Sequence, residues 1–201
     1  MLTLFDNADS GNAYKVRLLL ALLDIPYQRI EIDSVHGETR TPGFLQRNPN
    51  GKVPALELED GSYLWESNAL LWYLAADSAF LPEGRRDIAE VLQWMFFEQY
   101  SHEPYVAVLR AWARHGPISE EQRRQIPARE KEGYRALGVM EAHLDQRSFM
   151  VAGQPTIADL SLYAYTHVAG EGGFDLSDYP AIRGWLDRIA SLPGYVAMDA
   201  V

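Results

Sequence analysis

Residues 1–32, MLTLFDNADSGNAYKVRLLLALLDIPYQRIEI, decide how the first part of the chain folds. The short apolar run Leu2–Phe5 predicts a buried strand, and Ser10-Gly11-Asn12 is a helix-start signal. Leucines at helical spacing predict a helix over Ala13–Leu23, and Tyr27–Ile32 predicts a second strand. Strand, helix and strand within about 30 residues make a βαβ unit.

A β-β-α pattern follows farther along the chain. Val53–Leu58 and Tyr63–Trp65 predict two strands, and Asp60-Gly61 between them is a hairpin turn signal. Ser67–Ala76 carries leucines on one face and predicts a helix. The residues before these elements predict a loop, with one helical turn at Pro42–Gln46. The first part of the chain is therefore expected to be a small α/β domain.

The remainder of the chain predicts helices only. These predicted helices cover residues 88–114 with a break or kink at Pro104, 120–146, 156–168 and 181–191. Such a change from mixed to all-α elements indicates two packed units. We therefore expect an α/β plus all-α fold, with a first domain at residues 1–78, a linker at 79–86 and an all-helical domain at 87–201.

The chain is acidic. Its 201 residues carry a formal net charge of −10, and its isoelectric point is near 4.9. Binding to phosphates needs clustered lysines and arginines, so we expect no nucleic-acid partner and no anionic membrane partner.

The sequence contains no cysteine. Disulfides, cysteine zinc sites and a protein thiol nucleophile are therefore excluded. The five histidines are scattered without the spacing of a helical zinc site, so we predict no metal. No stretch reaches the ~20 apolar residues of a membrane span, and no basic segment precedes the first apolar run. A cytoplasmic location is the default expectation.

Four short motifs, taken in order, connect both predicted domains with a known family. The motifs are SGNAYKVR at Ser10–Arg17, NPNGKVP at Asn48–Pro54, the pair Glu66-Ser67, and TIAD at Thr156–Asp159. Together they resemble the cytosolic glutathione S-transferase family, with bacterial serine-type or Thr/Asn-type members as the nearest pattern. The resemblance implies a thioredoxin-like N-terminal domain followed by a helical bundle domain, glutathione as co-substrate, and a homodimer.

Ser10 and Asn12 are the candidate catalytic residues. They lie where a helix begins, and backbone N–H groups together with the positive end of the helix dipole stabilise an anion there. A thiolate is such an anion, and the Ser10 hydroxyl and the Asn12 amide are both hydrogen-bond donors. In serine-type members of the family the hydroxyl at the position of Ser10 faces the glutathione sulfur. The alternative is that Ser10 only caps the helix.

A second group of candidates fits the peptide part of glutathione. The resemblance implies a cis bond at Val53-Pro54, which would let an extended peptide pair with the Val53 backbone. Ser67, at a helix start, can bind the γ-glutamyl carboxylate, and Glu66 can pair with the ammonium group. Lys52 can pair with the glycine carboxylate. The alternatives are an edge-strand proline in trans, helix capping by Glu66 and Ser67, and a solvated lysine.

The helical half offers weaker candidates. Tyr100, Tyr105 and Arg110 could line an apolar pocket for a second substrate, although aromatic residues at helical spacing more often belong to the core. Thr156 and Asp159 are interpreted as structural, because a hydroxyl and an acid three residues apart satisfy the donors of a helix start.

The function implied by the resemblance is glutathione transfer: the protein activates glutathione as a thiolate, which attacks a small electrophile. Two alternatives stay open. One is a glutathione-dependent disulfide or peroxide reductase. The other is a non-catalytic interaction protein with the same fold, because a fold alone does not settle function.

Overall fold

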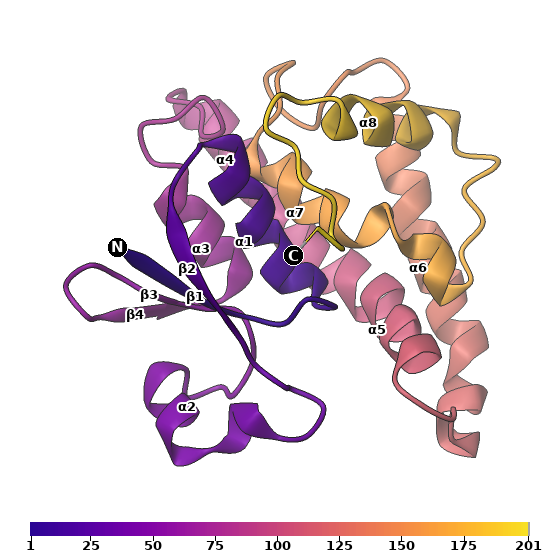
Figure 1. The fold of residues 1–201 in the computed structure, drawn as a ribbon. Coiled ribbons are helices and arrows are strands. Elements are labelled where there is room, and N and C mark those ends of the chain that lie inside the picture. Colours follow the sequence, from indigo (N-terminus) through magenta and orange to yellow (C-terminus); the bar gives the residue numbers. More distant parts are fainter. Residues whose placement is uncertain (201) are drawn as a thin grey trace. The chain divides into compact units, whose positions relative to one another are not determined.

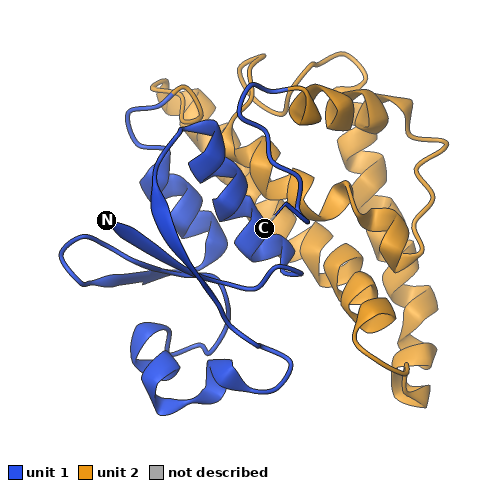
Figure 2. Cartoon of the chain, viewed as in Figure 1, with its two compact units in different colours: residues 1–78, 192–201 blue, residues 79–191 orange. Residues whose placement is uncertain are grey.

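The computed structural model describes residues 1–200, which divide into two compact units (Figure 2). Unit 1 contains residues 1–78 together with the segment that begins at Leu192, and unit 2 contains residues 79–191. This division differs from the predicted one at two places: residues 79–86 belong to unit 2, and residues 192–200 belong to unit 1.

Unit 1 is built on a sheet of four strands in the order β2-β1-β3-β4. The strands are β1 (Leu2–Asp6), β2 (Tyr27–Glu31), β3 (Ala55–Glu57) and β4 (Tyr63–Trp65). β1 pairs in parallel with β2, which requires the crossover helix between them, and β3 is antiparallel to both β1 and β4. The predicted βαβ and ββα halves of the thioredoxin-like domain are thereby confirmed.

Helices cover both faces of this sheet. The helices of unit 1 are α1 (Gly11–Leu22), α2 (Pro42–Arg47) and α3 (Ser67–Leu74). Figure 1 shows α1 and α3 on one side of the sheet and α2 on the other. The ring of Phe44 in α2 meets Phe5 edge to face at 6.4 Å, and the neighbouring strand residue Leu4 is fully buried on the opposite side. Both faces of β1 are therefore core.

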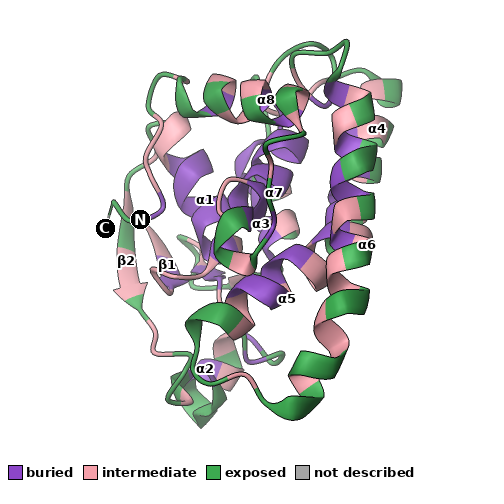
Figure 3. Ribbon diagram, turned by 90° about the vertical axis from the view of Figure 1, so that its right-hand side faces the viewer, coloured by how far each residue is buried: buried purple, intermediate pink, exposed green. Residues whose placement is uncertain are grey.

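Unit 2 is all-helical. Its helices are α4 (Arg85–Phe97), α5 (Glu103–Arg114), α6 (Glu120–Leu144), α7 (Ile157–Thr166) and α8 (Pro180–Ala190). Every residue of α7 is buried, whereas α6 exposes residues along much of its length (Figure 3). α7 is therefore the central helix of this unit.

The predicted helix over residues 88–114 is interrupted by a π-helical turn at Glu98–His102. Pro104 lies two residues after this turn, in the first turn of α5. A proline has no N–H to donate to the preceding turn, so the hydrogen-bond ladder must reorganise ahead of it. The predicted interruption is confirmed, and it begins six residues before the proline.

The interpretation of Thr156 and Asp159 as structural residues is confirmed. They form a capping box at the start of α7, and Asp159 is fully buried. The Asp159 carboxylate accepts hydrogen bonds from the backbone N–H of Met150 at 2.8 Å and from the indole N–H of Trp185 at 2.9 Å. One carboxylate therefore ties α7, α8 and the loop before α7 together.

Candidate functional site

The start of α1 is shaped by Ser10. This residue is the N-cap, with φ −82° and ψ 114°, and its Oγ accepts a hydrogen bond from the Ala13 N–H at 3.2 Å. The expected cap is therefore present. Accepting that bond uses a lone pair of the hydroxyl oxygen and leaves its proton available to donate. Capping and donation to a bound thiolate are compatible roles for Ser10.

Asn12 connects the start of α1 with the start of α3. The Ser67 hydroxyl donates to Oδ1 of Asn12 at 3.0 Å, and Ser67 is only 5% exposed. Oδ1 of Asn12 thus accepts from the first residue of α3, which links the two helix starts. The structure thus brings together two sequence-predicted residues that lie 55 positions apart.

Glu66 precedes α3 in an uncommon backbone conformation. Its φ is 72° and its ψ is 112°, a region that non-glycine residues rarely adopt and that clusters at functional sites. The Glu66 side chain makes no capping hydrogen bond. Its exposed carboxylate instead accepts from Nδ2 of Asn50 at 3.3 Å. The capping alternative for the Glu66 carboxylate is therefore not what the structure shows.

The loop before β3 presents the Val53 backbone. The Val53-Pro54 peptide bond is cis, as the resemblance implied. Pairing of β3 with β1 and β4 begins at Ala55, so Val53 lies just outside the ladder. Nδ2 of Asn48 donates to the Lys52 carbonyl at 2.7 Å, and the Lys52 side chain is exposed.

Three residues that shape this region, Asn48, Asn50 and Gly51, were not predicted as site residues. Asn48 is buried and accepts from the Asn50 N–H at 2.9 Å, and Asn50 in turn holds Glu66. Gly51 has φ 63°, and a Cβ there would lie 2.6 Å from Nη1 of Arg40. Asparagine and glycine are turn-forming types, so the Asn-Pro-Asn-Gly composition was the signal that could have identified them.

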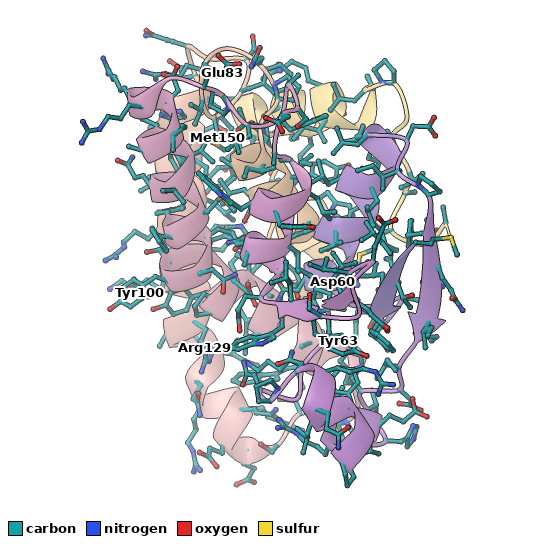
Figure 4. The ribbon with its side chains drawn as sticks, turned by 90° about the vertical axis from the view of Figure 1, so that its left-hand side faces the viewer. Asp60, Tyr63, Glu83, Tyr100, Arg129 and Met150 are labelled. Carbon is teal, nitrogen blue, oxygen red and sulfur yellow. The ribbon has the colours of Figure 1, made fainter. Side chains whose placement is uncertain are left out.

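The three candidates of the helical unit differ in their surroundings. Tyr100 lies in the π-helical turn, is 84% exposed and points outward at the periphery in Figure 4. Tyr105 is half-buried on α5. Arg110 is buried, and its Nε donates to Oε2 of Glu171 at 2.8 Å. Burial lowers the pKa of His167, which interacts electrostatically with this ion pair. The Arg110 guanidinium is thus engaged inside its own unit.

Two other kinds of site are absent from the described part of the chain. Among residues 1–200, no group of three or more acidic or histidine side chains is arranged to hold a metal ion. Within the same residues, no helix combines the length and apolar character needed to cross a bilayer.

Comparison with known proteins identifies the class. Residues 9–77 match the family described as "Glutathione S-transferase, N-terminal domain", and residues 94–193 match "Glutathione S-transferase, C-terminal domain". A crystal structure of a glutathione S-transferase from Pseudomonas fluorescens superposes with a TM-score of 0.96 and 51% identity, covering 98% of each chain. The chain belongs to the glutathione S-transferase family.

Among more distant relatives, one was crystallised with a ligand and one is named for its reaction. The glutathione transferase URE2P8 from Phanerochaete chrysosporium, crystallised with oxidized glutathione, is 27% identical, with a TM-score of 0.86 over 96% of this chain and 90% of that one. The disulfide-bond oxidoreductase YfcG of Escherichia coli is 28% identical over 92% of this chain and 89% of its own length. The family, the two-part fold and the glutathione transferase class predicted from the sequence are confirmed.

Proposed function

We propose that unit 1 binds glutathione with its sulfur at the start of α1 and its γ-glutamyl end at the start of α3, and transfers it to a small electrophile. The hydrogen bond from Ser67 to Asn12 carries this proposal, because it holds the two helix starts side by side. Each helix start offers N–H groups and a positive dipole end to an anion. A single extended peptide with a carboxylate and a thiolate matches such a pair of sites.

The peptide part of glutathione has a partner for each of its groups. The Val53 backbone pairs with the cysteinyl unit as an added strand would, since it lies at the open end of the β3 ladder. The Ser67 N–H and the α3 dipole receive the γ-glutamyl carboxylate, and Glu66 receives the ammonium group. Lys52, which is exposed, reaches the glycine carboxylate.

The groups around the sulfur are sufficient in strength. A thiol has a pKa of about 8.5, and lowering it by two units requires about 2.7 kcal/mol of preferential stabilisation of the thiolate. A hydrogen bond from Ser10 or Asn12 to a charged sulfur supplies roughly 1.5–3 kcal/mol. The start of a helix adds up to about 1 kcal/mol. The thiolate then attacks the electrophile, and the electrophile's leaving group departs.

Calorimetry tests this proposal with glutathione and S-methylglutathione. We expect both to bind, because Val53, Glu66 and Ser67 contact the peptide and not the sulfur substituent. Glu66→Gln should weaken both by about 3- to 10-fold, the loss of one partly exposed ion pair. Glu59→Gln makes the same chemical change on an exposed residue of unit 1 outside the site and should leave both affinities unchanged. No binding of either ligand to the wild type at millimolar concentration would refute the proposal.

Reduction of small disulfides is the second candidate, favoured by two donors, Ser10 and Asn12, at one helix start. The chain contains no cysteine, so glutathione must supply both thiols. One glutathione thiolate attacks the disulfide and releases a thiolate, and a second glutathione attacks the mixed disulfide to give oxidized glutathione and the second thiolate. The relatives named for disulfide-bond oxidoreduction and crystallised with oxidized glutathione support this chemistry.

Assays of both reactions with Ser10→Ala and Asn12→Ala separate the two candidates. We expect the wild type to have both activities, and Asn12→Ala to lose a larger fraction of disulfide reduction than of conjugation. Equal fractional losses would mean one shared thiolate step and no separate role for Asn12. A wild type inactive toward disulfides would leave conjugation alone. A homodimer stays a prediction of the family resemblance, and a cytoplasmic location stays the default expectation from the sequence.

A further inference from the structure

Arg17 occupies an unusual position in the middle of α1. Its side chain is only 3% exposed, and its guanidinium donates to three separate segments. Nη1 binds Oδ2 of Asp6 at 2.7 Å, while Nη2 binds the carbonyl of Ala8 at 3.1 Å and the carbonyl of Met198 at 2.9 Å. The first two partners lie at the end of β1 and in the loop that leads to Ser10, and the third lies in the C-terminal segment.

The loop between β1 and α1 is held from two sides. On the β2 side, the Ala8 N–H donates to Oε1 of Glu31 at 2.9 Å, and Nδ2 of Asn7 donates to the Ile32 carbonyl at 3.0 Å. The Ser10 N–H donates to the Asn7 carbonyl at 2.9 Å, which sets the direction in which the chain enters α1. On the α1 side, the bond from Arg17 to the Ala8 carbonyl fixes the same loop.

The C-terminal segment 192–200 lies along α1, as Figures 1 and 2 show within unit 1. Gly194 has φ 84°, and a Cβ there would lie 3.1 Å from the Ala21 carbonyl, near the end of the helix. The buried Tyr14 hydroxyl donates to the Val196 carbonyl at 2.8 Å. Met198 is 8% exposed and is the point at which the segment reaches Arg17.

We propose that Arg17 is a positioning residue for Ser10 and that the C-terminal segment completes this role, because its Met198 carbonyl accepts the second hydrogen bond that Nη2 donates. Arginine suits the task because its planar fork offers five donors and stays charged when buried. Asp6 holds Nη1 of the Arg17 guanidinium, and the Met198 carbonyl holds Nη2. Together they fix the orientation of the guanidinium plane, so that Nη2 also donates to the Ala8 carbonyl. Residues remote from Ser10 in the sequence thereby set where its hydroxyl stands at the start of α1.

The part of this inference that concerns the sulfur rests on the proposed function, and the part that concerns the loop does not. The test therefore starts with hydrogen exchange of the Ala8 and Ser10 amides in the protein without glutathione. Arg17→Lys keeps a charge for Asp6 but cannot reach three partners, and exchange should become about tenfold faster, as expected for loss of one hydrogen bond. Asp6 keeps its contact with Arg29, which limits the cost of this change to folding.

Two further chains make the test specific. A chain ending at Val196 removes the Met198 carbonyl, and the Tyr14 hydroxyl can then donate to the new terminal carboxylate of Val196. Loop exchange should again become faster, by at least about threefold. Tyr14→Phe is the matched control, because it removes one hydrogen bond to the same segment and keeps the aromatic ring beneath the Arg17 guanidinium. Its loop exchange should equal that of the wild type.

The functional readout is the pKa of the bound glutathione thiol beside the affinity for S-methylglutathione. In Arg17→Lys we expect the thiol pKa to rise by about half a unit to one unit, with less than about a twofold change in affinity for S-methylglutathione. The inference would be overturned if the loop amides of Arg17→Lys and of the shortened chain exchanged at the wild-type rate. It would also be overturned if Tyr14→Phe accelerated their exchange equally. A wild type that does not bind glutathione would refute the proposed function instead, and the exchange results would still decide the role of Arg17.

Discussion

Ser10 shows how one hydroxyl can serve both structure and chemistry. It caps α1 through a lone pair, and its proton is the one that we propose is donated to the glutathione thiolate. The sequence predicted the residue and both roles but gave no means of choosing between them, because capping and catalysis favour the same residue types at a helix start. The direction of the hydrogen bond from Ala13 is what makes the two roles compatible.

Ser10→Ala should lower turnover at neutral pH by about 10- to 100-fold and move the pH profile upward by about one unit, since one hydrogen bond to the thiolate is lost. Ser119→Ala is the matched control, because the Ser119 hydroxyl caps α6 by accepting from the Gln122 N–H at the same distance of 3.2 Å. Each variant should lose about 1 kcal/mol of stability from the missing cap. If Ser10→Ala shifts only the thermal midpoint, as Ser119→Ala does, Ser10 is a cap alone.

Ser67 should influence both ends of glutathione. It holds the Asn12 carbonyl, so Ser67→Ala releases the amide from its fixed orientation as well as weakening the carboxylate site. We expect a raised KM for glutathione together with a pH profile moved upward by a few tenths of a unit, the effect of a less well oriented donor. Glu66→Gln should raise KM without moving the profile. If the pH profile of Ser67→Ala overlays that of Glu66→Gln, Ser67 has no influence on the glutathione sulfur.

Helices and strands followed from local pattern where that pattern was strong. The strand Tyr63–Trp65 has the predicted bounds, and the helical turn expected at Pro42–Gln46 extends to Arg47 as α2. The break before Pro104 was expected, but its π-helical form was not. A proline in the sequence predicts that a helix is interrupted. The surrounding packing then decides which donors the unpaired backbone carbonyls accept from.

Asp159→Asn should destabilise the helical unit by about 3 kcal/mol or more. Its two carboxylate oxygens accept from the N–H groups of Met150 and Trp185 and from both the N–H and the hydroxyl of Thr156. An asparagine has one oxygen, so whichever way its amide turns, its NH2 group faces at least one buried N–H. Asp178→Asn, on an exposed residue, should change the thermal midpoint little. A melting curve of Asp159→Asn close to wild type would contradict this role.

At the scale of the whole chain, composition and motif order gave the two-part fold and the family. They did not predict that residues 192–200 pack in unit 1, because that segment is held by side chains that donate to its backbone carbonyls. Any residue supplies a carbonyl, so such contacts leave no pattern in the segment itself. The joining of Asn12 with Ser67 was hidden for a related reason: the contact depends on how two helix starts meet in space.

We propose above that unit 1 holds glutathione as a thiolate at the start of α1. The most direct measurement is a titration of the ultraviolet absorbance of the bound thiolate against pH, with S-methylglutathione as the blank. The account predicts a midpoint about two units below the value of about 8.5 for an unperturbed thiol, and an intermediate midpoint in Ser10→Ala. A wild-type midpoint equal to that of glutathione in solution would contradict it.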